Sequence, residues 1–422
     1  MVHIRFFTIL VTLMLLTGCG VTHEIKKELK NNNKESSFFK GFVLYDPITK
    51  KEIINHNGAK YFTPASNTKL YTFYTAYKAL NDSVKSLAYF KKNDSLIIKG
   101  TADPSLLYYG KDSTKVINFL KREVDSIYLL DTTIDETPYG SGWAWDDYQD
   151  YYMPEKSLFP IYGNIVRFST FSDSIISHPA YFRKSITFLD SLSITREITQ
   201  NKFFMERGAK DENEVPFINS NVLLAELLGK EISKKINLIP YQKKYDFSYL
   251  YGSPYDTLFK QLLVVSDNFI AEQLMLQVGK EVVDSYSVEA AIEYSLNNYL
   301  QDLPQQPRWV DGSGLSRYNL FSPNDMVFLL EKMYNEIATQ KLLNYFPVGG
   351  QSGTLKNWYA NDKPFVFAKS GSLSNNYNLS GYLITKKERL LIFSSMNNHY
   401  KIPTSEIKHG IENTLKKIYN SY

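Results

Sequence analysis

The chain has 422 residues, of which 43% are hydrophobic and 22% charged, as expected of a folded globular protein and not of a disordered or fibrous one. This length allows two or three domains. Lysine and arginine (48) barely outnumber aspartate and glutamate (44), and the charges are scattered along the chain. The composition therefore argues against nucleic acid as a partner.

The first residues have the pattern of an export signal. Arg5 precedes an apolar run, residues 6–16, that is too short to span a bilayer as a mature helix. Leu16-Thr17-Gly18-Cys19 follows directly and resembles the bacterial lipobox, in which the signal is cut before a cysteine that carries a lipid. We expect residues 1–19 to be a lipoprotein signal with Cys19 as the lipidated mature N-terminus, rather than an uncleaved signal anchor.

Cys19 is the only cysteine, so the folded part of the chain has no disulfide and no thiolate metal site. Residues 20–37 are polar and rich in lysine and asparagine. We expect this segment to be a flexible tether between lipid and folded domain. The protein is then exported and faces the periplasm, from either the inner or the outer membrane.

A folded domain is predicted from residue 38 onward. Phe39–Asp46 and Glu52–Asn55 have the composition of two strands joined by a turn at Pro47. A helix is predicted to start at Ser66, because a break at Pro64 precedes it and apolar residues then recur at helical spacing. These residues are Leu70, Phe73, Tyr74, Tyr77 and Leu80.

The middle of the chain differs in composition and hydrophobic pattern. Across residues 86–244, β-rich runs alternate with loops rich in Asp, Ser, Gly and Pro, which predicts one or two inserted β-rich domains. Helical spacing resumes near Pro254, and strands followed by a final helix are predicted toward the C-terminus. The predicted runs are Ser95–Lys99, Ser126–Leu130 and Ile165–Ser169 in the insertion, then Phe365–Leu373, Leu379–Thr385, Leu390–Met396 and the helix Thr404–Tyr419.

This order of elements predicts an α+β fold. Residues 38–85 and 245–422 are expected to form one discontinuous domain, a sheet flanked by helices, interrupted by the inserted residues 86–244.

Three short motifs stand in one order along the chain, Ser66-Asn67-Thr68-Lys69, Ser266-Asp267-Asn268 and Lys369-Ser370-Gly371. Together they resemble the Ser-x-x-Lys, Ser-Asp-Asn and Lys-Thr-Gly signature of penicillin-binding proteins and serine β-lactamases, with one Thr replaced by Ser. Each motif alone is weak, since the chain holds other matches to the first two. Order and separation leave Ser66, Ser266 and Lys369 as the only consistent set.

The spacing of the first motif has a chemical reason. Residues three apart on a helix share one face, so Lys69 can reach Ser66. A lysine beside a second cation has a lowered pKa and can act as the base that activates a serine nucleophile. Lys369 is the candidate second cation. Backbone N–H groups of Ser66 and Ser372 are the candidates for an oxyanion hole.

The remaining motif residues suit the other tasks of acyl transfer. Ser266 can relay a proton to the leaving amine and Asn268 can bind the substrate amide. The strand formed by Lys369, Ser370, Gly371 and Ser372 can hold the substrate and its carboxylate. The alternative is that the serines and Asn268 cap helices and that Lys369 is a solvated strand residue. Three motifs in order make this alternative remote.

Further segments show a resemblance to the class C low-molecular-mass penicillin-binding proteins, the D-alanyl-D-alanine carboxypeptidase and endopeptidase family. The resemblance runs from about residue 40 to the C-terminus. Ser66 and Ser266 are 200 positions apart, which matches the extra domains that this family places between its first two motifs and that single-domain β-lactamases lack. The segments are Pro64–Lys69, Lys99–Leu106, Trp143–Asp147 with Pro154 and Asn164, Asp311–Asn319, Gly353–Leu355 and Ala368–Leu373.

The resemblance implies a serine D,D-peptidase that acts on peptidoglycan stem peptides without a metal or cofactor. Ser66 is acylated at the D-Ala-D-Ala bond and the ester is then hydrolysed, and β-lactam antibiotics are covalent inhibitors. Asp146 with Tyr151 would contact the diaminopimelate side chain of the stem, and Arg317 would lie in the cleft. A loop cap for Asp146 and a structural salt bridge for Arg317 are equally simple explanations.

Two other functions fit the same residues. One is an esterase or β-lactamase-like hydrolase, which differs from a peptidase in how fast it turns over the acyl-enzyme. The other is a non-catalytic lipoprotein that binds the cell wall, although the intact motifs argue against it. The sequence does not distinguish carboxypeptidase from endopeptidase activity. The insertion is shorter and more aromatic than in typical family members, so substrate preference can differ.

Overall fold

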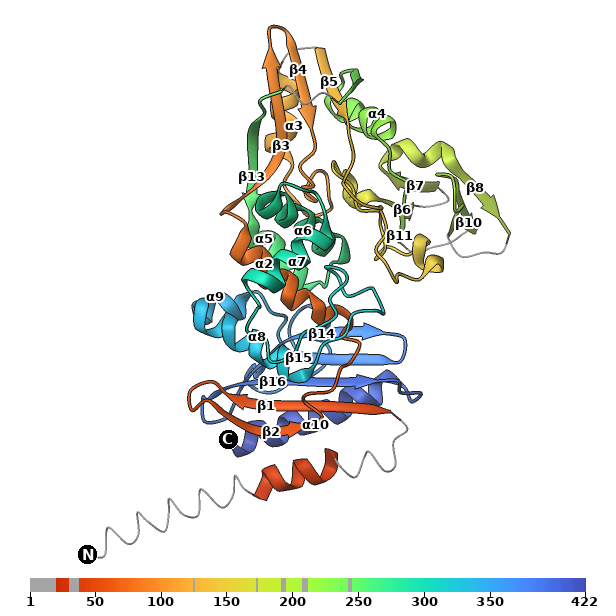
Figure 1. Cartoon of the computed structure of the whole chain (residues 1–422). Coiled ribbons are helices and arrows are strands. Elements are labelled where there is room, and N and C mark those ends of the chain that lie inside the picture. The colour runs from red at the N-terminus through yellow and green to blue at the C-terminus, as the bar shows by residue number, and fades with distance from the viewer. Residues whose placement is uncertain are drawn as a thin grey trace, which may run out of the picture. The chain divides into compact units, whose positions relative to one another are not determined.

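The computed structural model describes residues 20–29, 38–123, 126–171, 174–190, 195–206, 212–241 and 245–422 (Figure 1). The proposed signal with Cys19, and residues 30–37 of the expected tether, lie outside this set. The described chain divides into two compact units. The first unit holds the residues up to Tyr74 with Phe259–Ser266 and Leu300–Tyr422, and the second holds Thr75–Leu258 and Asp267–Tyr299.

The first unit is built on a five-stranded antiparallel sheet with the order β14-β15-β16-β1-β2. The two N-terminal strands are therefore joined to the three C-terminal ones, as a discontinuous domain requires. All five strands predicted for this domain are confirmed, although β15 starts three residues earlier than expected. The strands are β1 (Phe39–Asp46), β2 (Lys51–His56), β14 (Val366–Leu373), β15 (Asn376–Ile384) and β16 (Leu390–Asn398).

Helices cover both faces of this sheet (Figure 1). Successive side chains of a strand point to opposite faces, and on β1 Phe42 and Leu44 join the hydrophobic cluster that includes the buried side of α10 (Thr404–Ser421). The next residue, Tyr45, donates a hydrogen bond to Glu331 of α8 (Pro323–Glu336) at 2.8 Å. The unit also contains α9 (Thr339–Asn344), the 3-10 turns η1 (Ala65–Thr68) and η5 (Gly353–Leu355), and parts of α2 (Lys69–Ala79) and α5 (Tyr255–Val264).

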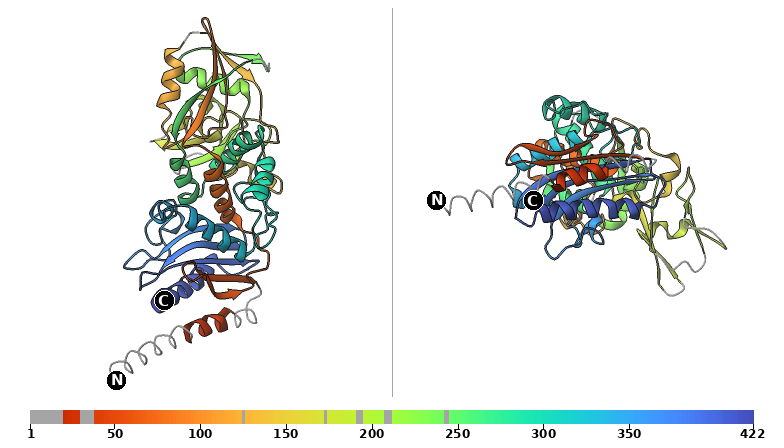
Figure 2. Two further views of the ribbon diagram at one scale, coloured as in Figure 1. Left: turned by 60° about the vertical axis from the view of Figure 1, so that its left-hand side comes forward. Right: turned by 90° about the horizontal axis from the view of Figure 1, so that it is seen from below.

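Residues 20–29 form a helix, which corrects the expectation of a flexible tether for this part of residues 20–37. Val21, Ile25 and Leu29 recur every fourth residue and make one apolar stripe. Ile25 is only 1% exposed, because the stripe packs against the hydrophobic cluster that contains α10 (Figure 2). A short helix gains its stability from such packing and not from its own propensity. The polar composition of the segment therefore did not predict this helix.

The second unit contains three sheets. A mixed five-stranded sheet has the order β12-β5-β4-β3-β13, and two smaller sheets have the orders β11-β6-β7 and β8-β10-β9. The three strands predicted in the insertion are confirmed as β4, β5 and β6. The strands are β3 (Ser83–Lys92), β4 (Ser95–Lys99), β5 (Ser126–Asp131), β6 (Ile165–Phe171), β7 (Ser174–His178), β8 (Ile186–Leu189), β9 (Thr195–Arg196), β10 (Phe203–Glu206), β11 (Asn213–Pro216), β12 (Ile236–Pro240) and β13 (Ser248–Pro254).

The second unit is larger than the predicted insertion 86–244. Helices α6 (Asn268–Val283) and α7 (Val288–Asn298) belong to it, although we expected them in the sheet-and-helix domain. Its hydrophobic core joins Leu87 and Ile98, from neighbouring strands of the large sheet, to Leu228 of α4. The other helices and 3-10 turns of this unit are α3 (Thr114–Arg122), η2 (Trp145–Gln149), η3 (Tyr162–Asn164), η4 (Ala180–Ser185) and α4 (Asn221–Ile232).

Within the residues that the structure describes, no helix is long and apolar enough to cross a membrane.

Candidate active site

Ser66 and Lys69 lie at the junction between a turn and a helix in the first unit. Ser66 is on the 3-10 turn η1, so the predicted helix begins one turn later than expected, at Lys69. Lys69 is fully buried, whereas Ser66 is half-buried. The Lys69 Nζ donates a hydrogen bond to the Ser66 Oγ at 3.1 Å. The two residues that the spacing paired are thus in direct contact.

Lys369 contacts the second motif from strand β14. Its Nζ donates hydrogen bonds to the Ser266 Oγ at 2.8 Å and to the Ser370 carbonyl oxygen at 2.6 Å. Lys369 is fully buried. Burial, and secondly the charge of Lys69, hold the pKa of Lys369 well below the ordinary value of a lysine. The charge of Lys69 therefore acts on the protonation of Lys369, while the lowered pKa of Lys69 that we expect from the sequence stays a prediction.

Gly371 lets strand β14 pass directly against the turn that carries Ser66. A Cβ atom at Gly371 would lie 2.4 Å from the Pro64 carbonyl oxygen and 3.0 Å from the Ser66 backbone nitrogen. Any side chain at this position would push the strand away from the turn. Ser372, the proposed second oxyanion donor, is the next residue of the strand and is exposed.

Two contributions to this site were not predicted from the sequence. The Ser370 Oγ donates a hydrogen bond to the Thr354 Oγ1 of η5 at 2.7 Å, and the Lys69 Nζ donates one to the Ser313 carbonyl oxygen at 2.7 Å. Thr354 and Ser313 belong to segments that carried the family resemblance, which was the only signal for them. A carbonyl oxygen is present at every residue, so no side-chain pattern could identify Ser313.

Arg317 follows Ser313 in the same loop. It is exposed, and its Nη1 lies 3.5 Å from the carbonyl oxygen of Ser374, in the turn between β14 and β15. Arg317 therefore lies beside the end of the strand that holds Lys369, and its contact there is a long one to a backbone carbonyl oxygen.

The second motif is divided between the two units. Ser266 is the last residue of its segment in the first unit, and Asp267 begins the next segment of the second unit. Asp267 caps α6 by accepting a hydrogen bond from the Ile270 N–H at 2.9 Å. The Nδ2 of Asn268, the first residue of α6, donates to the Tyr152 carbonyl oxygen at 2.9 Å. Within the second unit, Asn268 thus holds the aromatic segment that carries Tyr151.

Asp146 and Tyr151 are both exposed on this segment of the second unit. Asp146 lies on η2, and Tyr151 follows it with a side chain that is 63% exposed. The Tyr151 and Tyr152 rings meet edge to face at 5.5 Å between centroids. Exposed positions leave both side chains accessible to a ligand.

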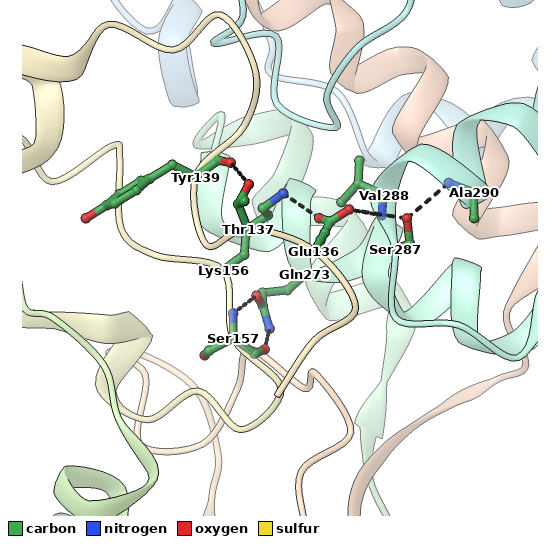
Figure 3. Close-up of polar contacts among 9 residues, drawn as sticks. All are labelled: Glu136, Thr137, Tyr139, Lys156, Ser157, Gln273, Ser287, Val288 and Ala290. Carbon is green, nitrogen blue, oxygen red and sulfur yellow. Dashed lines mark hydrogen bonds and ion pairs between the residues drawn. The ribbon is translucent and has the colours of Figure 1, made fainter. Parts of the chain in front are cut away.

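The segment is fixed at both of its ends (Figure 3). At one end, Glu136 forms an ion pair with Lys156 and accepts a hydrogen bond from the Val288 N–H of α7 at 2.9 Å. At the other end, Gln273 of α6 accepts from the Ser157 N–H at 3.1 Å and donates to the Ser157 carbonyl oxygen at 2.8 Å. These contacts explain why α6 and α7 group with the second unit.

Comparison with known proteins agrees with this geometry. Residues 21–185 and 229–418 match the D-Ala-D-Ala carboxypeptidase 3 (S13) family. The chain belongs to this family. The resemblance inferred from the motifs is confirmed, and the protein is a serine-type D,D-peptidase of the penicillin-binding-protein class.

Relatives of this S13 peptidase are distant in sequence but similar over most of their length. The D-alanyl-D-alanine carboxypeptidase DacB of Haemophilus influenzae is 24% identical over 87% of each chain. The penicillin-sensitive carboxypeptidase A of Dictyostelium discoideum is 23% identical over 84% of this chain and 81% of its own.

Solved structures confirm the predicted fold class of this S13 peptidase. Penicillin binding protein 4 from Haemophilus influenzae superimposes with a TM-score of 0.78 at 20% identity, over 93% of this chain and 99% of that one. A predatory endopeptidase from Bdellovibrio bacteriovorus has a TM-score of 0.54 at 18% identity, over 90% and 92% of the two chains.

Proposed function

We propose that this S13 peptidase cleaves the D-Ala-D-Ala bond of peptidoglycan stem peptides through an acyl-enzyme on Ser66. The observation that carries the proposal is the pair of contacts Lys69 to Ser66 and Lys369 to Ser266, because each places a buried lysine on a serine hydroxyl. An activated nucleophile needs a base within hydrogen-bond distance, and the leaving amine needs a proton donor.

The proposed reaction has two steps; the contact between Lys69 and Ser66 supports its first proton transfer, and the return of that proton to Ser266 is part of the proposal. Lys69 takes the proton of the Ser66 hydroxyl, and the Ser66 Oγ attacks the carbonyl carbon of the scissile bond. The C–N bond breaks as Ser266 gives its proton to the leaving amine, and the proton held by Lys69 replaces it. Water then hydrolyses the ester and releases the shortened peptide.

Without substrate, the low pKa of Lys369 favours its neutral form, and the scheme needs the protonated form, which a bound substrate carboxylate would favour. A cation beside Lys69 disfavours the protonated form of Lys69, which is the form that cannot accept a proton. Lys369, with Ser370, is also the proposed binding site for the substrate carboxylate, whose negative charge would favour a protonated Lys369. Ser66 and Ser372 N–H groups are the proposed oxyanion hole, and Asn268 the proposed partner of the substrate amide.

β-Lactams offer a direct test, because a β-lactam acylates the same serine. Solved relatives include penicillin binding protein 4 of Haemophilus influenzae complexed with a β-lactam, and we propose the same susceptibility here. The protein lacking residues 1–19 is incubated with benzylpenicillin, and its intact mass is measured beside that of a Ser66→Ala variant. One penicilloyl adduct that is absent from the variant supports the proposal. A folded wild-type protein without an adduct refutes Ser66 as nucleophile.

The fate of the adduct distinguishes the alternatives. A peptidase keeps the penicilloyl group for a long time, whereas a β-lactamase releases it rapidly. Incubation with a stem pentapeptide and with a cross-linked peptide dimer then separates carboxypeptidase from endopeptidase activity, since loss of D-alanine and cleavage of the dimer give different products.

We further propose that the peptidase is a lipoprotein that faces the periplasm. The support is the Leu16 to Cys19 sequence directly after an apolar run. Expressed from its full gene, the wild-type protein should fractionate with membranes and carry a lipid mass, whereas a Cys19→Ser variant should lack the lipid. Equal masses of the two processed proteins would refute the lipid anchor.

A further inference from the structure

The segment Asp311–Asn319 lies outside the three motifs, yet it folds as a closed loop around one carboxylate. The Asp311 Oδ1 accepts hydrogen bonds from the Gly314 N–H at 2.8 Å and the Asn319 Nδ2 at 2.7 Å. Its Oδ2 accepts one from the Ser316 N–H at 2.6 Å. Asp311 is 1% exposed and Asn319 is fully buried. One buried side chain thus determines the path of the loop.

The loop is fitted tightly to the turn and helix that carry Ser66 and Lys69. Gly314 has a φ of +80°, and a Cβ atom there would lie 2.0 Å from the Ala65 carbonyl oxygen. The Thr72 Oγ1 of α2 donates a hydrogen bond to the Gly312 carbonyl oxygen at 2.5 Å. Between Gly312 and Gly314, the Ser313 carbonyl oxygen is therefore held in one place.

That carbonyl oxygen accepts the hydrogen bond from the Lys69 Nζ at 2.7 Å. A neutral lysine amine has two N–H bonds and one lone pair, and only the lone pair can accept a proton. Donating one N–H bond to Ser313 restricts rotation of the amine, so the lone pair can face the Ser66 Oγ at 3.1 Å.

We propose that Asp311 is a positioning residue, which fixes the Ser313 carbonyl oxygen so that this oxygen orients Lys69 toward Ser66. The inference rests on the proposed function, in which Lys69 is the base. In this scheme Asp311 acts through the loop that it closes.

The test is the Asp311→Asn variant, which turns an amide N–H₂ toward one of the backbone N–H donors and displaces the loop without changing side-chain size. Benzylpenicillin acylation is followed over a range of concentrations, which separates non-covalent binding from the acylation rate constant. A displacement of about 1 Å at a reacting group costs on the order of 100-fold in rate, so we expect that loss in the rate constant. Non-covalent binding and the final yield of one adduct per chain should stay unchanged.

Asp325→Asn is the matched control. Asp325 is also fully buried, in the same unit, and its Oδ2 accepts a hydrogen bond from Ser322 at 2.7 Å at the start of α8. This substitution destabilises the fold in the same manner, and we expect wild-type acylation kinetics. Equal rate losses in both variants, or a loss of adduct yield alone, would mean that Asp311 is merely structural and would overturn the proposal.

The pH dependence of the acylation rate constant shows whether Asp311 affects the orientation or the protonation of Lys69. If Asp311 orients Lys69, the rate constant of Asp311→Asn stays low on the alkaline plateau, where Lys69 is neutral in both proteins. Recovery of the wild-type rate there would overturn the proposal. If Asp311→Asn does not fold, Asn319→Ala takes its place. It removes one donor to Asp311 together with the hydrogen bonds of Asn319 to the Val310 N–H and the Ser316 carbonyl oxygen, and we expect a loss in the same rate constant. Failure of the proposed function would give a different result from failure of this inference, because the wild-type protein itself would then form no Ser66 adduct.

Discussion

Lys369 is the residue at which we expect both a pH-dependent contribution to stability and a large contribution to acylation. Its folded pKa is lowered by burial and by Lys69, so between that pKa and the ordinary value of 10.5 the unfolded chain binds more protons than the folded one. The free energy of unfolding therefore rises with pH across this window. In Lys369→Met we expect this rise to be smaller, and acylation to fall by about 100- to 10,000-fold.

Chemical denaturation of both proteins at several pH values from about 6 upward measures the effect on stability. The difference in unfolding free energy, wild type minus variant, should increase with pH. A difference that is constant or that decreases would contradict a depressed pKa at Lys369.

Gly371 gives a second prediction at the residue scale, one that tests close packing. In Gly371→Ala the new Cβ meets backbone atoms of Pro64 and Ser66, which cannot rotate away. Overpacking of this kind costs about 1–3 kcal/mol, and displacement of β14 from η1 should slow acylation on the order of 100-fold. Gly410→Ala in α10 is the control, since its Cβ would meet nothing within 4 Å. Thermal unfolding and acylation kinetics check both, and the control should lose neither stability nor activity.

The side chains of the site were predictable from the sequence to the extent that chemistry depends on residue type. Ser66, Lys69 and Lys369 were identified because nucleophiles and bases need particular groups at particular spacings. Ser313 contributes through its carbonyl oxygen, which its side chain does not specify, and the close approach at Gly371 depends on the path of two segments far apart in the chain. Backbone contributions of this kind follow only from the fold.

At the scale of elements, the helix of residues 20–29 gives a prediction of its own. Ile25 is 1% exposed, and Lys417 of α10 forms ion pairs with Glu24 and Glu28 of this helix. The ion pairs are exposed and contribute little to stability. The packing of Ile25 should therefore be the main interaction that holds this helix against the first unit. Loss of a buried isoleucine costs about 2–5 kcal/mol, and in Ile25→Ala we expect faster amide hydrogen exchange in residues 20–29 with unchanged acylation.

The matched control is Ile48→Ala, in the same unit but at a position that is 72% exposed. It should leave exchange in residues 20–29 as in the wild type. Unaltered exchange in Ile25→Ala would mean that the helix does not depend on this contact.

Strands and long helices were predictable because each carries its own periodic signal over many residues. The strands of the first unit and α10 were identified in this way. Gln273 illustrates the opposite case. It is fully buried in α6 and bonds to Ala102 and Ser157, although a glutamine in a helical pattern favours a surface position. Its partners lie far away in the chain, and they assign α6 to the second unit.

At the scale of the whole molecule, the proposed nucleophile and base lie in the first unit, and the second unit holds the proposed substrate-binding residues Asp146 and Tyr151. The resemblance to the family implies that Asp146 and Tyr151 recognise the stem side chain. Because benzylpenicillin lacks that side chain, a recognition role and a catalytic role can be separated by comparing the two ligands. Asp146 is exposed and Tyr151 is 63% exposed, so substitution of either should leave the fold intact.

We expect Asp146→Asn to lower kcat/KM for a stem peptide with a diaminopimelate third residue, and to leave benzylpenicillin acylation unchanged. A hydrogen bond to a charged group contributes about 1.5–3 kcal/mol, which corresponds to a loss of about 10- to 100-fold. Asp112→Asn, at another exposed position of the same unit, controls for net charge and should have no effect. The loss should disappear for a peptide in which an uncharged residue replaces diaminopimelate, since no ammonium is left to bind. Equal losses with both peptides, or any loss with benzylpenicillin, would instead show that Asp146 supports the fold of its segment, which Glu136 and Gln273 anchor at its two ends.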